Sequence, residues 1–192
     1  LKSIDSERQV QSKKRKSFFR TSFVGYTNVG KSSLMKSVTK SDVLIRNQLF
    51  ATLDTTVRRL FIGDNNYVLL SDTVGFIRNL PDNLIASFKS TLQEVVDSNL
   101  LLIVLDANSQ DLFNEIETIK SVLKEINANE IDYKYVFNKI DLVDPEKISY
   151  LKQSFPDSLM VSATRSLQIS DIKDTIAEKY EEWVSALKNP SH

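Results

Sequence analysis

One octapeptide limits the folds that this chain can adopt more than any other feature of the sequence. Its residues are Gly25-Tyr26-Thr27-Asn28-Val29-Gly30-Lys31-Ser32. It matches G-x-x-x-x-G-K-[ST] and lies between strand-forming residues 18–24 and a helical stretch at residues 31–40. Glycines at both ends let the backbone wrap tightly, so its amides point inward at phosphate oxygens, and the helix N-terminus adds partial positive charge. The octapeptide predicts a phosphate-binding loop (P-loop), in which Lys31 reaches the β- and γ-phosphates and Ser32 ligates Mg²⁺. The candidate nucleotide contacts are Gly25, Tyr26, Thr27, Asn28, Val29, Gly30, Lys31, Ser32 and Ser33.

A second motif, Asp72-Thr73-Val74-Gly75, follows a predicted strand and fits D-x-x-G. Alone it carries little weight, because this spacing is common in turns. Behind a P-loop, it predicts that Asp72 holds Mg²⁺ through a water and that the Gly75 amide contacts the γ-phosphate. Many GTPases place a Gln directly after this glycine to orient the attacking water, whereas this chain has Phe76. We therefore expect slow intrinsic hydrolysis and assign no catalytic residue.

The third motif, Asn138-Lys139-Ile140-Asp141, ends a strand, where ligands bind in open α/β sheets. Guanine presents two donors that one carboxylate accepts together, whereas adenine presents a lone pair there and would leave the carboxylate unpaired. Asp141 is therefore predicted to read guanine, Asn138 to hold the loop and the base edge, and the Lys139 stem to pack over the ring. After the last strand, Ser162 and Ala163 are candidates to supply an amide to the guanine carbonyl. The predicted ligands are GTP and GDP.

The remaining patterns alternate between strand and helix periodicities, which is typical of an α/β fold. We expect a P-loop NTPase of the Ras-like G-domain type, with a mostly parallel six-stranded sheet, one antiparallel edge strand and helices on both faces. The antiparallel strand comes from a hairpin that turns at residues 63–66, and residues 41–57 are predicted to form an exposed loop. Strands are predicted at residues 18–24, 58–62, 67–71, 100–105, 133–137 and 159–161, and helices at 31–40, 84–96, 116–126, from Pro145 onward, and at 169–187.

Composition restricts the partners and the compartment. The 192 residues include no Cys, which excludes a disulfide framework and thiolate zinc sites and fits a reducing cytosol. The longest aliphatic run, residues 100–105, is far shorter than the ~20 residues of a membrane-spanning helix. We expect a cytoplasmic monomer with no membrane span. Residues 1–20 hold seven basic and two acidic side chains, a net +5 in a chain of zero formal charge, so this arm is either a contact for RNA phosphates or a solvated helix end.

Four stretches resemble the HflX family of ribosome-associated GTPases, and the similarity runs from about residue 18 to residue 187. They are Gly25-Tyr26-Thr27-Asn28, Asn47-Gln48-Leu49-Phe50-Ala51-Thr52-Leu53-Asp54, Asp72-Thr73-Val74-Gly75-Phe76-Ile77-Arg78 and Ser90-Thr91-Leu92-Gln93-Glu94-Val95.

The resemblance implies a role for Thr56, because the family follows Leu-Asp with Pro-Thr and that Thr closes over Mg²⁺. Here Thr55 replaces the Pro, so Thr56 is the expected Mg²⁺ ligand and γ-phosphate contact, with Thr55 as the alternative. The resemblance further implies binding to the large ribosomal subunit. It identifies residues 1–17 as the end of a basic helical linker from a missing N-terminal domain, 18–188 as the GTPase domain and 189–192 as a tail.

Three other functions stay open on the sequence alone. A GTP-binding regulatory module without appreciable hydrolysis would carry the same base and phosphate motifs. A P-loop ATPase is disfavoured by Asn138-Lys139-Ile140-Asp141, and an RNA-binding module built on the basic arm would ignore nucleotide state. Asn28 also permits K⁺ beside the phosphates, where some translation GTPases with Asn at this position bind it.

Overall fold

The computed structural model describes residues 18–39, 44–45, 56–73 and 89–188 of the chain. Its strands are β1 (Arg20–Val24), β2 (Leu44–Ile45), β3 (Thr56–Gly63), β4 (Asn66–Asp72), β5 (Leu100–Asp106), β6 (Asp132–Asn138) and β7 (Leu159–Met160). Its helices are α2 (Lys31–Val38), α4 (Lys89–Val96), α5 (Leu112–Glu125), the 3₁₀ turn η1 (Ile140–Leu142), α6 (Pro145–Ser154) and α7 (Ile169–Lys188).

The described strands form one sheet in the order β2-β3-β4-β1-β5-β6-β7. The five strands from β4 to β7 run parallel to one another, while β3 is antiparallel to both of its neighbours. Strand β5 lies in the interior of the sheet, between β1 and β6, and its aliphatic side chains at residues 100–105 are all buried, as expected for a parallel strand covered on both faces. The expected mostly parallel sheet is confirmed.

The β3–β4 hairpin explains why one strand opposes the others. Gly63 pairs with Asn66, so the loop has two residues, and both Asp64 and Asn65 have positive φ. This backbone is the type I′ turn, whose twist matches that of the flanking strands. The predicted hairpin is confirmed at the residues that the sequence indicated.

The edge of the sheet beside this hairpin differs from the prediction. The two-residue strand β2 adds a seventh strand, because Leu44 and Ile45 pair with Arg58 and Val57. Two residues are too few to show a strand periodicity, so no strand was predicted at Leu44–Ile45. The predicted loop at residues 41–57 was also too long, since Thr56 and Val57 already belong to β3 and the Val57 side chain is buried.

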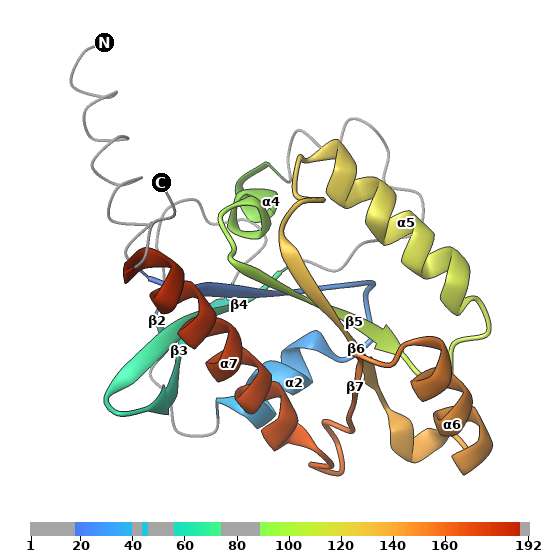
Figure 1. The fold of residues 1–192 in the computed structure, drawn as a ribbon. Coiled ribbons are helices and arrows are strands. Elements are labelled where there is room, and N and C mark those ends of the chain that lie inside the picture. The colour runs from blue at the N-terminus through green and yellow to red at the C-terminus, as the bar shows by residue number, and fades with distance from the viewer. Residues whose placement is uncertain (1–17, 40–43, 46–55, 74–88, 189–192) are drawn as a thin grey trace.

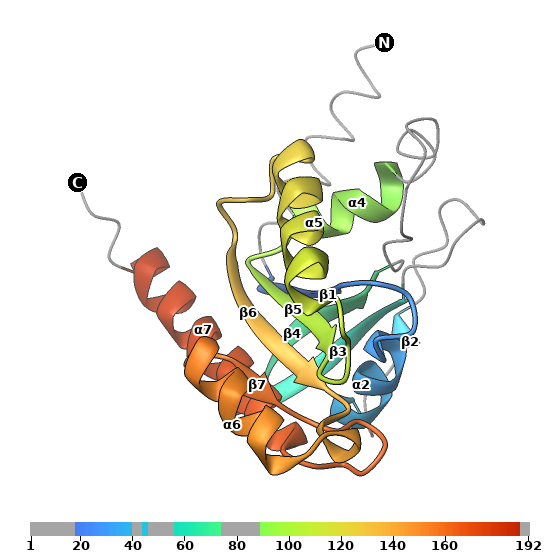
Figure 2. The ribbon, with the colours of Figure 1, turned by 90° about the vertical axis from the view of Figure 1, so that its right-hand side faces the viewer.

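Helices cover both faces of the sheet, as expected. In both ribbon views α4 and α5 lie on one face, and α2 and α7 lie side by side on the other (Figures 1 and 2). Aromatic contacts fasten α7, because the Phe19 ring packs edge-on against Tyr180 and Trp183. Trp183 is partly buried and packs against the hydrophobic core. The predicted start of α6 at Pro145 is confirmed too, and the Asp144 carboxylate caps it by accepting from the Lys147 amide.

Candidate functional site

The carboxyl ends of the parallel strands meet at one edge of the sheet, and the motif residues follow these ends. β1 ends at Val24 before the P-loop, β4 ends at Asp72, and β6 ends at Asn138. The register aligns them, because Phe23 lies beside Asp72 and Asp106 lies beside Asn138. Open α/β sheets bind their ligands in the crevice at this edge. The three motifs that are far apart in the sequence are therefore brought to one place.

The backbone of the P-loop requires its glycines. Gly25 and Gly30 both have positive φ, and a Cβ at either position would collide with a neighbour. At Gly25 the neighbour is the Val104 carbonyl oxygen, and at Gly30 it is the Asn138 side-chain amide. Asn28, at the tip, is in the left-handed region that Asn tolerates better than most residues. The loop is thus pressed against β5 on one side and against the third motif on the other.

Lys31 is the first residue of α2 and its side chain is buried. Its ammonium donates to the carbonyl oxygens of Gly25 (3.0 Å) and Tyr26 (2.8 Å). Burial lowers the pKa of the Lys31 ammonium to about 8, and the nearby Asp72 carboxylate partly offsets this effect. The loop therefore holds its lysine across its own backbone, where an anion with several oxygens would be a stronger partner.

The Ser32 hydroxyl donates to Oδ2 of Asp72 at 2.5 Å, so the two predicted Mg²⁺ ligands lie together. The other carboxylate oxygen, Oδ1 of Asp72, is buried and accepts no hydrogen bond from the described residues. Burial raises the pKa of Asp72, against the lowering effects of the Ser32 hydrogen bond, Lys31 and Arg58. A buried carboxylate oxygen beside a hydroxyl suits a hard cation that prefers oxygen ligands, so these residues fit Mg²⁺.

Thr56 lies at the same edge. It opens β3 and is the direct partner of Asp72 across the β3–β4 pair, with its side chain half-buried. Its role as a Mg²⁺ ligand stays a prediction. Arg58, two residues on, donates through Nη1 to the Thr39 hydroxyl at 3.0 Å, so its guanidinium is held at the end of α2.

Asn138 joins two loops through its buried side chain. Its Nδ2 donates to the Val29 carbonyl in the P-loop at 2.9 Å, and its Oδ1 accepts from the Ala163 amide at 3.0 Å. The predicted loop-holding role of Asn138 thus has a geometric basis. Because the Ala163 amide already donates to Asn138, it would have to share or exchange that hydrogen bond to meet a guanine carbonyl. Ser162 is fully buried, and its hydroxyl accepts from the Arg165 amide.

Lys139 and Asp141 differ in how they are held. The Lys139 backbone is left-handed, with φ 66°, and its ammonium lies 2.6 Å from Oδ2 of Asp106. Asp141 lies in η1 with an exposed side chain, and no described residue donates to its carboxylate. The base-reading carboxylate therefore faces solvent without a competing partner in the described part of the chain.

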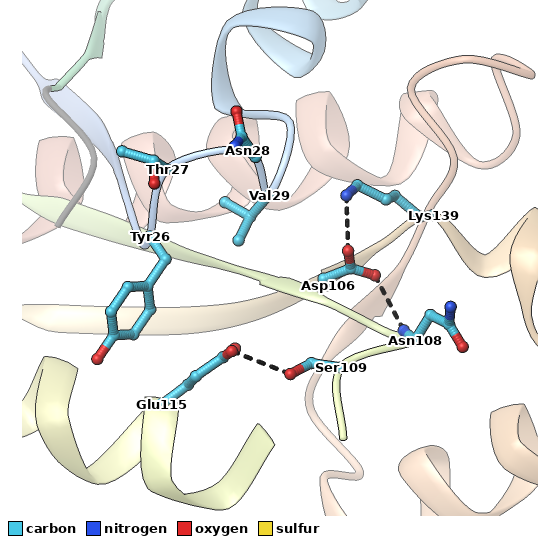
Figure 3. A pocket seen from close by; sticks show the side chains of 9 residues that line it. All are labelled: Tyr26, Thr27, Asn28, Val29, Asp106, Asn108, Ser109, Glu115 and Lys139. Atoms are coloured by element: carbon cyan, nitrogen blue, oxygen red, sulfur yellow. Dashed lines mark hydrogen bonds and ion pairs between the residues drawn. The ribbon is translucent and has the colours of Figure 1, made fainter. Parts of the chain in front are cut away.

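A cavity of about 420 Å³ lies between the P-loop and the turn that follows β5 (Figure 3). In Figure 3 the Tyr26 side chain extends toward the helix that carries Glu115, while Asp106 and Lys139 form the opposite wall. Lys31, Ser32 and Asp72 do not line this cavity, which lies beside the phosphate-binding groups rather than over them. Its lining consists of Tyr26, Thr27, Asn28, Val29, Asp106, Asn108, Ser109, Glu115 and Lys139.

Residues 20–139, which contain all three motifs up to Lys139, match the family described as 50S ribosome-binding GTPase. The chain belongs to this family.

Relatives of this GTPase family carry the name GTPase HflX, so the resemblance to HflX is confirmed. Identity is 44% over 167 residues in Gluconacetobacter diazotrophicus, 51% over 141 in Flavobacterium psychrophilum and 42% over 160 in Escherichia coli. These matches cover 87%, 73% and 82% of this chain, but only 37%, 34% and 38% of the relatives. The chain thus spans little more than a third of their length.

Solved structures of GTPases have the same fold. A GTP-binding protein from Sulfolobus solfataricus, in complex with GDP, superposes with a TM-score of 0.67 at 24% identity, covering 95% of this chain and 58% of that one. Era, in complex with MgGDPNP and a piece of 16S ribosomal RNA, gives 0.65 at 21% identity, covering 84% and 56%. The predicted P-loop NTPase fold is confirmed.

Several predicted features lie outside the described residues: Gly75, Phe76, Thr55, the linker at 1–17 and the tail at 189–192. The cavity residues that lie at, follow or face the end of β5 were not predicted from the sequence, namely Asp106, Asn108, Ser109 and Glu115, and Asp106 is the one that contacts a motif residue. Its signal was present, because a carboxylate directly after a buried aliphatic strand falls at the ligand-binding edge.

Among the described residues, no helix is long and apolar enough to span a membrane, and no three His, Cys, Asp or Glu side chains are grouped to hold a metal.

Proposed function

We propose that the chain binds GTP and GDP together with Mg²⁺, hydrolyses GTP slowly, and acts as a nucleotide-dependent switch on the large ribosomal subunit. The observation that carries the proposal is the double hydrogen bond of Asn138, which ties the phosphate-binding loop to the loop after β7. A site built this way couples a phosphate pocket to a base pocket. Asp141 lies within the same motif as the guanine-reading carboxylate. The family match and the HflX relatives support the ribosomal partner.

Each site residue has a distinct proposed task. The amides of residues 25–33 bind the phosphates, and Lys31 exchanges its two backbone carbonyls for phosphate oxygens. Ser32 and Thr56 are the proposed direct ligands of Mg²⁺, with Asp72 acting through water. The buried Oδ1 of Asp72, which accepts no hydrogen bond from the described residues, supports this assignment. When bound, Mg²⁺ neutralises charge on the phosphate oxygens.

We expect slow hydrolysis by the chain alone because Phe76 cannot orient water, and a missing orienting group or arginine finger costs ~10³–10⁵ in rate. The partner is expected to supply the missing order at the nucleotide. Asn28 is the proposed K⁺ contact beside the phosphates. The absence of Cys fits a reducing compartment, and we propose that the chain acts in the cytoplasm. We also propose that it acts as a monomer.

Single-turnover hydrolysis of GTP tests the proposal, using this chain and its full-length protein, each with and without purified large ribosomal subunits. We expect slow turnover by the chain alone and a clear increase with subunits for the full-length protein. Lys31→Ala, which removes a phosphate contact, should abolish both the slow turnover of the chain alone and the increase with ribosomal subunits. Replacing KCl by NaCl should slow the parent, and Asn28→Ala should remove that difference.

The same experiment distinguishes the alternative function, a regulatory GTP-binding module, from a result that contradicts the proposed switch. Tight GTP binding with no hydrolysis under any condition would favour a regulatory GTP-binding module. Fast hydrolysis by the chain alone, together with a full-length protein that ignores ribosomal subunits, would contradict the proposed switch.

A further inference from the structure

A carboxylate outside the three motifs, that of Asp106, forms an ion pair with the motif lysine Lys139. Nζ of Lys139 lies 2.6 Å from Oδ2 of Asp106, and both side chains are about three-quarters buried. At that distance the contact is a charge-assisted hydrogen bond, and partial burial limits its screening by solvent. Figure 3 shows the pair forming one wall of the cavity beside the P-loop.

Asp106 is a rigid anchor. It is the last residue of β5 and pairs directly with Asn138 of β6, so its backbone is part of the sheet. Its second carboxylate oxygen, Oδ1, accepts from the Asn108 amide at 3.0 Å, and the Ala107 amide donates to the Asn138 carbonyl at 2.9 Å. Both carboxylate oxygens are therefore engaged, one with the backbone of the turn and one with Lys139.

Lys139 needs such an anchor. The left-handed backbone at φ 66° sets where the Lys139 side chain begins. Its four-carbon stem is flexible, however, and can adopt many rotamers. Among the described residues, Asp106 is its hydrogen-bonding partner. Asn138, the neighbouring motif residue, is held instead by Val29 and Ala163, and those hydrogen bonds leave the Lys139 side chain unconstrained.

We propose that Asp106 is a positioning residue for base recognition: by holding the ammonium of Lys139, it keeps the lysine stem where the guanine ring packs. The inference rests on the proposed nucleotide site and deepens it. Because the stem is ordered before binding, the nucleotide does not bear the entropic cost of ordering it. Among the described residues, the Asp106 carboxylate is hydrogen-bonded to the Asn108 amide and to Lys139, and not to the amides of residues 25–33 or to Lys31, so we expect its effect to be confined to the base.

Isothermal titration calorimetry with Mg²⁺ separates base from phosphate recognition when GDP and inorganic tripolyphosphate are compared as ligands. In Asp106→Asn, which keeps the shape but removes the charge, the Kd for GDP should rise about three- to ten-fold while that for tripolyphosphate stays within about two-fold, as expected from immobilising one side chain. Lys139→Met keeps a stem of similar length and should show the same loss. The double variant should lose no more than either single variant, because both remove the same ion pair.

Glu117→Gln is the matched control, because it breaks the exposed ion pair with Lys120 on α5, away from the cavity. It should leave both affinities unchanged. Three results would overturn the positioning role: an unchanged Kd for GDP in Asp106→Asn, equal losses for GDP and tripolyphosphate, or additive losses in the double variant. A parent chain that binds neither ligand would refute the nucleotide site itself, and the positioning role with it.

Discussion

Two side chains of the guanine motif at residues 138–141 have different roles, because one is buried and the other is exposed. Asn138 is 2% exposed and makes two hydrogen bonds to separate loops. Asp141 is exposed and accepts no hydrogen bond from the described residues. Asn138 therefore holds the loops of the site together, whereas the Asp141 carboxylate is exposed and accessible to a base.

This difference in burial predicts effects of very different size for two substitutions in the motif on the free energy of unfolding without nucleotide. Asn138→Ala leaves the Val29 carbonyl and the Ala163 amide unpaired in the interior, so it should lower that free energy by about 2–4 kcal/mol. Asp141→Ala removes an exposed side chain and should change it by less than about 0.5 kcal/mol. Urea denaturation of both variants checks the prediction. Equal effects would show that the motif is not divided in this way.

Among the elements, α4 is fastened to the sheet by its last turn. The Arg20 guanidinium of β1 lies 3.0 Å from the Glu94 carboxylate, and both side chains are largely buried. The Ser98 hydroxyl donates to the Glu94 carbonyl at 2.7 Å and lies 2.7 Å from the Ser22 hydroxyl. This end of α4 is anchored on β1, while residues 74–88, which contain the Gly75 and Phe76 positions, lie outside the described residues.

Glu94→Gln should therefore destabilise the chain, because it removes a carboxylate charge that helps to compensate a buried guanidinium. We expect a loss of about 2 kcal/mol in the free energy of unfolding, less than for a fully buried pair since some solvent reaches both groups. Glu117→Gln breaks an exposed pair and should cost less than about 0.5 kcal/mol. Urea denaturation compares the two. Equal losses would argue against anchoring through this ion pair.

At the scale of the whole molecule, local patterns predicted the elements better than the contacts between them. The aliphatic run at residues 100–105 became β5, and Pro145 opened a helix, because each pattern reflects burial or backbone geometry at its own position. The two residues of β2 are too few to show a period. The Asp106–Lys139 pair depends on how β5 and β6 align, and a single sequence does not show register. For the same reason, the engagement of the Ala163 amide by Asn138 was not foreseen.

The central claim is that the carboxyl edge of this sheet binds a guanine nucleotide, and comparing GDP with ADP tests it most directly. Titration calorimetry of the 192-residue chain with Mg²⁺ should give an affinity for GDP at least ~10³-fold above that for ADP, because a hydrogen-bonding site rejects analogues that leave its carboxylate unpaired. In Asp141→Asn the GDP affinity should fall by about 10²–10⁴-fold, as expected for the loss of two hydrogen bonds to a charged group, and xanthosine diphosphate should become the better ligand. Equal affinities of the parent for GDP and ADP, or GDP binding unchanged in Asp141→Asn, would contradict the account.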